Sequence, residues 1–309
     1  MNILITGGTG FIGTPLAREL RGKGHSVTVT TRRPSDSKDK LTWSAPALIP
    51  PDIISRFDAV INLAGEPIAP RRWTKDRKER ILSSRINTTR ALVESIRQIE
   101  HTPLSPLDRG ERKRLPKVLI SASAVGFYGA HGDEYVTEDT PPAGDFLADV
   151  CKQWEAEAYK ALDLGIRVVT VRIGGVLEAD GGALPMMALP FKFFLGGPIG
   201  SGRQWFSWIH RDDIIGIIIF ALENDSVSGP VNMTAPNPVT NREFSRSLGQ
   251  VLHRPSFLAV PGIVVKLMLG ELGAVLLTGQ RVLPEKILRA GYRFKYSDVS
   301  QALRAILGK

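Results

Sequence analysis

Three glycines near the start of the chain have the spacing of a phosphate-binding turn. Gly7, Gly10 and Gly13 follow an apolar run, 3–5, and precede an amphipathic stretch, 12–20. The first glycine permits a tight turn, the second lets the backbone approach a pyrophosphate, and the third lets the helix pack on the strand. N–H groups at the start of that helix bind phosphate oxygens, so the turn predicts a dinucleotide site. The intervening residues belong to the same predicted site: Thr9, Phe11 and Ile12.

The end of the next apolar run carries cations where many dinucleotide sites carry an acid. Residues 26–30 have the pattern of a strand and are followed by Thr31, Arg32 and Arg33, and residues 21–35 contain no Asp or Glu. An acid here binds the ribose 2′-hydroxyl of NAD, whereas a cation suits the 2′-phosphate of NADP. We therefore predict NADP(H) as the cofactor, with Arg32 at the 2′-phosphate and Thr31 as a neighbouring donor. Two solvated arginines in a loop are the alternative interpretation.

Glu66 is a candidate general base, because it directly follows the strand-like run 59–63. The alternative is a carboxylate that caps a helix or forms a salt bridge. The segment Arg71–Trp73 is either a rim for an acidic substrate or a charged loop. We interpret His210 as a packing residue and Cys151 as a small core residue rather than a nucleophile.

These residues require a sheet that brings the ends of several strands to one edge. Short runs rich in Val, Ile and Leu alternate with helical stretches. The runs are 3–6, 26–30, 59–63, 118–121 and 168–172, and the helical stretches are 12–20, 76–99 and 145–164. This alternation predicts an α/β Rossmann fold with a doubly wound parallel sheet. Ligands of such sheets bind at the carboxyl edge of the strands.

The second half of the chain has a different composition. It is first rich in Gly and Pro and then has a mainly helical pattern. We predict a dinucleotide-binding Rossmann domain over 1–175, to which 206–235 returns. A smaller, mainly helical substrate region is expected over 176–205 and 236–309.

Composition narrows the classes of partner. The chain has 309 residues, a net charge of +9 and a single cysteine, Cys151, which excludes an intrachain disulfide and a Cys-based zinc site. One cysteine is compatible with a reducing, cytoplasmic location, and the first residues lack the pattern of a signal peptide. The basic segment 97–117 has no interleaved aromatic residues and has the composition of a surface loop. We expect a small-molecule substrate and no nucleic acid, and a homodimer is compatible with the composition.

Two apolar stretches raise the question of a membrane. Residues 214–222 are too short to span a bilayer, and residues 257–279 contain Pro261, Lys266 and Glu271. We interpret both stretches as core helices and expect no membrane partner.

Several motifs together resemble the extended short-chain dehydrogenase/reductase superfamily. They are Thr-Gly-Gly-Thr-Gly-Phe-Ile-Gly at 6–13, Asp-Ala-Val-Ile-Asn-Leu-Ala-Gly at 58–65, Phe-Tyr-Gly at 127–129 and Trp-Ile-His-Arg-Asp-Asp at 208–213. Further motifs at 63–66, 71–73, 196–202 and 283–286 resemble an atypical branch, called the epimerase family by homology and sometimes labelled a cell-division inhibitor. The resemblance implies a Rossmann domain that binds NADP(H). It also implies further cofactor contacts: Leu63 and Ala64 at the adenine-ribose side, Ser121 and Ala122 at the nicotinamide, and Arg172 closing the sixth strand.

The proton-transfer pair of that superfamily is missing here. The family uses a Tyr and a Lys four residues later, and the Lys lowers the pKa of the Tyr. Aligned on Glu155, this chain has Leu147 and Cys151 in those positions. Lys152 lies one residue further along and is turned by about 100° around the helix.

Other residues are candidates for the missing chemistry. Tyr128 belongs to a motif whose Tyr is usually structural in the superfamily, and Ser123 adjoins Ala124, which occupies the place of the family Ser/Thr. Arg85 takes the place of a supporting Asn and contacts either a cofactor phosphate, an acidic substrate or a packing network. The catalytic candidates are therefore Glu66, Ser123, Tyr128 and Lys152.

We therefore predict an NADP(H)-binding oxidoreductase or epimerase-like protein of unknown substrate, without the usual Tyr-x-x-x-Lys pair. The alternative is a catalytically silent NADP(H)-binding sensor or scaffold, linked to cell division. A third interpretation is that the basic segment 97–117 binds an acidic partner.

Overall fold

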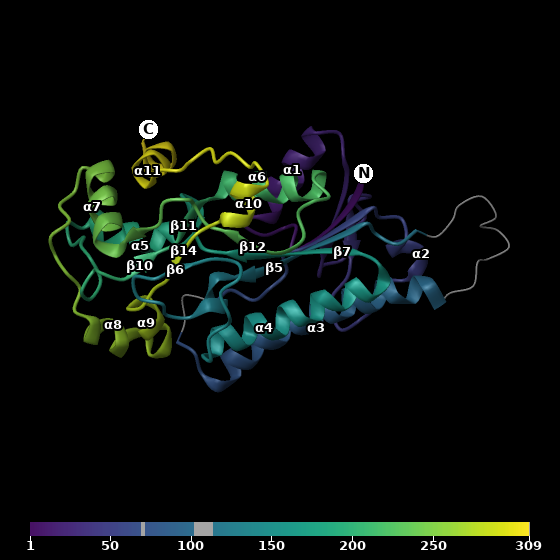
Figure 1. The fold of residues 1–309 in the computed structure, drawn as a ribbon, viewed down its shortest axis with the longest axis horizontal. Helices are drawn as coiled ribbons and strands as arrows, with labels where there is room; N and C mark the ends of the chain where they lie inside the picture. The colour runs from purple at the N-terminus through teal and green to yellow at the C-terminus, as the bar shows by residue number, and fades with distance from the viewer. Residues whose placement is uncertain (69–71, 102–113, 309) are drawn as a thin grey trace.

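A seven-stranded sheet forms the centre of the protein (Figure 1), and the computed structural model describes residues 1–68, 72–101 and 114–308. The strand order is β12-β7-β5-β4-β1-β2-β3, and every pair of neighbours is parallel. The strands are β1 (Asn2–Thr6), β2 (Ser26–Thr31), β3 (Lys40–Thr42), β4 (Ala59–Asn62), β5 (Val118–Ala124), β7 (Arg167–Ile173) and β12 (Gly229–Met233). The predicted α/β Rossmann fold is confirmed.

The order reverses between β1 and β4, and this reversal fixes where a ligand binds. From β1 the chain adds β2 and β3 on one side, whereas β4, β5 and β7 lie on the other. The carboxyl ends of β1 and β4 therefore border a crevice, the position at which doubly wound sheets bind dinucleotides. The segment after β1 is the glycine-rich turn.

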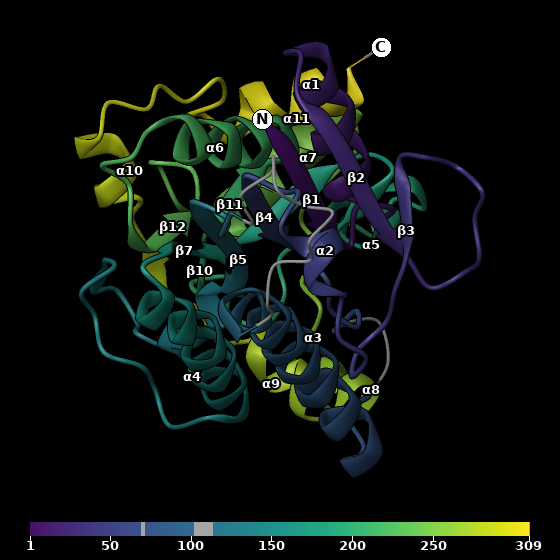
Figure 2. The ribbon, with the colours of Figure 1, turned by 90° about the vertical axis from the view of Figure 1, so that its right-hand side faces the viewer.

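Helices cover both faces of the sheet, as Figure 2 shows end-on. One face carries α1 (Gly13–Gly22) and α6 (Arg211–Glu223), and the other carries α2 (Pro51–Ile54), α3 (Lys75–His101) and α4 (Phe146–Tyr159), followed by η3 (Lys160–Leu164). Each layer has its own apolar core against the sheet. The strands are buried on both faces, and this explains their continuous runs of Val, Ile and Leu.

Most of the remaining elements gather beyond the carboxyl edge of the sheet, whereas α10 (Glu285–Arg289) lies beside α6 and packs on β12 (Figure 1). The helices are α5 (Leu184–Lys192), α7 (Asn241–Leu252), α8 (Gly262–Leu269), α9 (Glu271–Leu276), α10 (Glu285–Arg289) and α11 (Val299–Leu307). The short strands are β6 (Tyr135–Val136), β8 (Gly175–Glu178), β9 (Gly181–Gly182), β10 (Trp205–Phe206), β11 (Trp208–His210), β13 (Val239–Thr240) and β14 (Arg281–Val282), and η2 (Val125–Tyr128) follows β5. α5, α7 and α11 share a core around Trp208.

The structure confirms the expected core helix for one of the two apolar stretches and not for the other. Residues 214–222 lie in α6 and are mostly buried, as expected. The expectation of a core helix over 257–279 is wrong: Gly270, at a φ of +61°, ends α8, and α9 begins at the next residue. Several of its apolar side chains are exposed, among them Ile263 and Leu267. None of the helices within the described ranges is long and apolar enough to cross a membrane.

Candidate functional site

The glycine-rich turn connects β1 to α1 at the crevice. Gly7 has a φ of +69°, and a Cβ on it would lie 2.8 Å from the backbone of Leu63. A Cβ on Gly13 would lie 2.3 Å from the carbonyl oxygen of Gly7, so the first turn of α1 packs directly on the loop. The N–H of Gly10 donates to that same carbonyl at 3.0 Å. Gly7 and Gly13 are therefore required by the backbone path, and the turn lies against the backbone of Leu63 and Ala64.

The side chain of Phe11 points from this turn toward a small hairpin. Its ring packs on Gly181 and Gly182 of β9, where a Cβ would overlap it. The guanidinium of Arg211 lies 5.0 Å from the ring centre and forms ion pairs with Glu178 and an acid of the hairpin turn. The β8–β9 hairpin thus covers one side of the predicted phosphate site. Of the other turn residues, Thr9 is exposed and Ile12 packs on the α1 core.

The end of β2 presents the predicted cations to solvent. The Oγ1 of Thr31 accepts the N–H of Arg33 at 3.2 Å. The guanidinium of Arg32 is exposed and has neither a hydrogen bond nor an ion pair with any residue the structure describes. Arg32 is therefore free to receive an anionic group beside β1.

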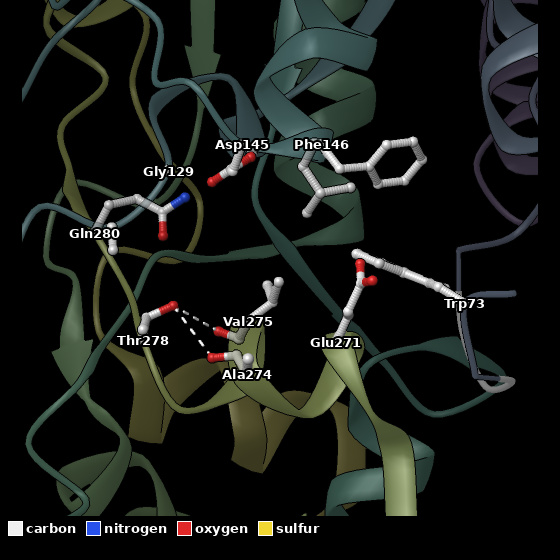
Figure 3. A pocket seen from close by; sticks show the side chains of 12 residues that line it. Trp73, Gly129, Asp145, Phe146, Glu271, Ala274, Val275, Thr278 and Gln280 are labelled. Atoms are coloured by element: carbon white, nitrogen blue, oxygen red, sulfur yellow. Dashed lines mark hydrogen bonds between the residues drawn. The ribbon is translucent and has the colours of Figure 1, made fainter. Parts of the chain in front are cut away.

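A cavity of about 300 Å³ opens between α4, α9 and the segment after β5 (Figure 3). Its walls are largely apolar and include Trp73, Leu147 and Val275. A Cβ on Gly126, just past the carboxyl end of β5, would lie 3.1 Å from the Cβ of Leu147. The position that holds the catalytic Tyr in the superfamily thus presents an apolar side chain to this cavity.

A few polar groups also face the cavity, and the sequence analysis missed them. Asp145 caps α4 by accepting the N–H of Ala148 at 2.9 Å, and Gln280 donates to the carbonyl of Val125 at 2.8 Å. Figure 3 shows the carboxyl group of Asp145 near the amide of Gln280, with Thr278 further along the wall. A capping pattern identifies Asp145 only as the start of a helix. Its place beside residue 280 depends on the tertiary fold.

Cys151 and Lys152 do not form a proton-transfer pair with any tyrosine. Cys151 is buried, its Sγ lies 3.6 Å from the carbonyl oxygen of Ala124, and burial raises the pKa of its thiol to about 11. Lys152 extends into solvent and pairs with Asp149 at 3.6 Å on the same helix. Helix geometry therefore turns the proposed catalytic lysine away from the cavity.

Tyr128 and Ser123 lie in a buried polar network, not in the cavity. The hydroxyl of Tyr128 donates to Asn232 at 2.6 Å and accepts from Arg172 at 2.9 Å, and burial raises the pKa of Tyr128 to about 12. Ser123 donates to Glu155 at 2.6 Å. Both side chains have protein partners and almost no exposed surface, so the geometry favours structural roles over the expected catalytic ones.

Arg172 is the cation of the same network. Its Nε and Nη2 each lie 2.8 Å from a different oxygen of Glu155, and its Nη1 also donates to the carbonyl of Glu138. Burial alone lowers the pKa of Arg172, but the hydrogen bonds and charge of Glu155 outweigh it and raise the pKa above its ordinary value. The expected cofactor contact does not agree with this geometry, because the guanidinium is enclosed by protein groups.

Ser121 and Ala122 also turn their side chains into the protein. The Oγ of Ser121 accepts from Asn62 at 3.3 Å in a buried cluster, and Ala122 packs in the core beneath α6. Neither side chain reaches the carboxyl edge of the sheet, where the resemblance expects the nicotinamide.

Glu66 and Arg85 organise the loop that follows β4. The carboxylate of Glu66 forms an ion pair with Arg77, and Arg85 donates to the carbonyl of Glu66 at 3.0 Å. Arg85 also donates to Ile81 and lies over the ring of Trp154, and burial lowers its pKa. The salt-bridge interpretation of Glu66 and the packing interpretation of Arg85 match this geometry.

The loop before α3 is tied to the C-terminal region. The guanidinium of Arg72 donates to the carbonyls of Leu267 and Met268 at the end of α8, and Lys78 pairs with Glu271 of α9. Trp73 lines the cavity, whereas Arg71 lies outside the described residues. His210, as expected, packs: it caps α6, stacks on Tyr296 at 4.0 Å, and its pKa is lowered by burial.

Comparison with known proteins places this geometry in a family. Residues 3–233 match the NAD dependent epimerase/dehydratase family. The chain belongs to that family. Residues 260–306, which contain α8 to α11, match a domain of unknown function, DUF1731.

The similar proteins cover the whole chain. An epimerase family protein SDR39U1 homolog from chloroplasts of Arabidopsis thaliana is 44% identical over 99% of this chain and 87% of its own length. The epimerase family protein YfhF of Bacillus subtilis is 41% identical over 99% of this chain and 98% of its own. The crystal structure of human epimerase family protein SDR39U1 with NADPH has a TM-score of 0.86 at 36% identity and covers 100% of this chain and 99% of that chain. A UDP-glucose 4-epimerase of Thermus thermophilus, with a TM-score of 0.73 and 17% identity, shares the fold.

Proposed function

We propose that this chain is an NADP(H)-dependent oxidoreductase or epimerase-like enzyme whose proton transfer does not use the tyrosine–lysine pair of its superfamily. The observation that carries the proposal is the shared location of the turn and the cavity. The turn follows β1, and Gly126 of the cavity follows β5 of the same parallel sheet, so both lie at its carboxyl edge.

The cofactor half of the site has groups for the phosphates and the adenosine side of NADP(H). The N–H groups at the start of α1 would bind the pyrophosphate, and Leu63 and Ala64 form the wall beside Gly7. Arg32 meets the 2′-phosphate as an unpaired cation. A relative of 36% identity whose structure contains NADPH supports this assignment.

The substrate half combines an apolar wall with a few carboxylates. A bound nicotinamide supplies or accepts a hydride, and the apolar side chains of Leu147 and Val275 exclude water from the cavity. The carboxylate of Asp145, which lines the cavity, holds the proton in this proposal, whereas Glu66 is paired with Arg77. Tyr128 is enclosed and Lys152 faces solvent, so neither takes this role.

Asp145→Asn tests the proposal without removing the helix cap, because Asn caps helices as well as Asp. Purified protein is screened with NADPH and carbonyl compounds, and with NADP and alcohols, by following the absorbance of NADPH. We expect turnover with one class and a loss of about 10²-fold in kcat for Asp145→Asn, with an unchanged Kd for NADPH. If bound NADPH is never oxidised by any substrate class, the enzyme assignment is wrong.

A second function has one observation in its favour: the usual proton-transfer pair is absent, because residues 147 and 151 are Leu and Cys. A catalytically silent NADP(H) sensor would bind a partner according to the state of the cofactor. Pull-down with and without NADPH tests this, and identical recovery of partners in both would exclude it.

A further inference from the structure

A second cavity of about 340 Å³ continues from the first one and has a different chemical character. Both cavities share Ala130 and Thr278 in their walls, so they lie side by side, and we call the two together the groove. The first is lined mainly by apolar side chains, whereas the second is lined by Arg203, Gln204, Trp205 and other polar groups. A molecule that fills the groove therefore meets an apolar end and a polar end.

Arg203 supplies the positive charge of the polar end. Its side chain is exposed, and within the described part of the chain its guanidinium has no hydrogen-bond or ion-pair partner. Its backbone is nevertheless held, because the N–H of Arg203 donates to the Oγ of Ser201 at 3.2 Å. The cavity thus carries, in the loop before β10, a cation without a partner among the described residues.

Gln204 adds an oriented acceptor. Its Nε2 donates to the carbonyls of Ile199 at 2.9 Å and of Leu276 at 3.2 Å, and these two bonds fix which way the amide points. Its Oε1 is buried and has no partner among the described residues. A buried acceptor without a donor is costly, and a donor on a molecule bound in the adjoining cavity would remove that cost.

Trp205 forms a rigid wall beside these groups. Its Nε1 donates to Asp133 at 2.8 Å, and the guanidinium of Arg281 lies 4.1 Å from its ring centre and 4.1 Å from that of Tyr135. The carboxylate of Asp133 also lines the cavity. Among the described residues that line this cavity, Arg203 is the one cation and Asp133 the one carboxylate, a combination that suits a ligand with a single negative charge better than a phosphate dianion.

We infer that the second cavity is a substrate subsite for a carboxylate, bound by Arg203, on a molecule whose apolar body lies in the first cavity against Leu147. A hydroxyl or amide N–H next to that carboxylate donates to Gln204. This inference deepens the proposed function and rests on it, because it names the class of substrate: elongated carboxylic acids with an apolar body.

Binding of simple probes tests the subsite. Octanoate, octanol and octyl phosphate are titrated calorimetrically into the full chain, with and without saturating NADPH. We expect octanoate to bind more tightly than the other two, and Arg203→Ala to weaken octanoate about tenfold or more while leaving octanol unchanged, since a charge-assisted hydrogen bond is lost. Arg304→Ala is the matched control: Arg304 is exposed on α11 and lines neither cavity.

A second variant tests whether one molecule occupies both cavities. Val275→Trp fills the first cavity, so octanoate and octanol should both bind at least tenfold more weakly. Equal octanoate affinity in the wild type and Arg203→Ala, tighter binding of octyl phosphate, or unchanged octanoate binding in Val275→Trp would each overturn the inference. A wild-type protein that binds octanoate as expected but not NADPH would instead refute the proposed function.

Discussion

At the scale of single residues, we propose that Arg32 sets the preference of the site for NADP(H). The proposal rests on a guanidinium just after β2 that has no hydrogen-bond or ion-pair partner among the described residues, and on the absence of an acid in 21–35. Arg32→Glu should weaken NADPH binding by about 10- to 100-fold, because it removes a charge-assisted contact and adds repulsion. The affinity for NADH, which lacks the 2′-phosphate, should fall much less.

Fluorescence titration with both cofactors measures these losses. Arg33→Glu is the matched control, since the neighbouring arginine is also exposed but is not assigned to the phosphate. Equal losses of affinity for NADPH and NADH in Arg32→Glu would show that Arg32 does not bind the 2′-phosphate.

At the scale of elements, a pH-dependent contact joins α3 to α4. Glu157 of α4 is mostly buried and binds Arg90 of α3 at 2.7 Å and Lys160 at 2.7 Å. Burial alone raises the pKa of Glu157, but hydrogen bonds from Arg90 and Lys160 outweigh it and lower the pKa below the ordinary 4.5. A lowered pKa means that this contact stabilises the fold above the unfolded pKa and is lost as the pH falls through the folded pKa.

Glu157→Gln should therefore be less stable than the wild type at pH values above 4.5, and the difference should shrink as the pH falls below 4.5. Urea unfolding at several pH values measures the free energy of unfolding for both proteins. Glu94→Gln is the control, because its pair with Arg97 is exposed and 3.8 Å long. A difference between wild type and Glu157→Gln that stays constant with pH would contradict this interpretation.

At the scale of the whole molecule, Asp213 of α6 binds the C-terminal segment 292–296 through hydrogen bonds. Its buried carboxylate, at the start of α6, accepts the N–H of Lys295 at 2.7 Å and of Tyr296 at 3.0 Å, and the hydroxyl of Tyr292 at 3.1 Å. The segment then leads into α11 and the core around Trp208. One side chain therefore joins parts of the chain more than eighty residues apart.

Asp213→Ala should reduce the free energy of unfolding by about 2–4 kcal/mol, because it leaves two backbone N–H groups without an acceptor. Asp212→Ala removes the partly exposed pair with Lys295 and a 4.0 Å contact with His210, and it should cost about 1 kcal/mol or less. Denaturant unfolding compares the two. Equal stability of both variants would show that the Asp213 contacts do not hold the C-terminal segment.

The sequence alone determined the sheet, the glycine-rich turn and the cations after β2. Runs of apolar residues form buried strands. Gly13 is required because a side chain there would overlap Gly7, and Gly7 is required by its positive φ and its contact with Leu63, just after β4. The missing Tyr and Lys were also visible, because their spacing on one helix is local. The family match over 3–233 agrees with the resemblance on which these predictions rested.

Only the tertiary structure decided what the remaining polar residues do. Tyr128 and Arg172 have side-chain types that suit catalysis or cofactor binding, yet their partners, Asn232 and Glu155, lie 104 and 17 residues away in the sequence. Packing encloses both of these side chains, whereas it leaves Asp145 and Arg203 open to the groove. Burial and the distances between remote segments are properties of the folded chain, so residue type and spacing do not reveal them.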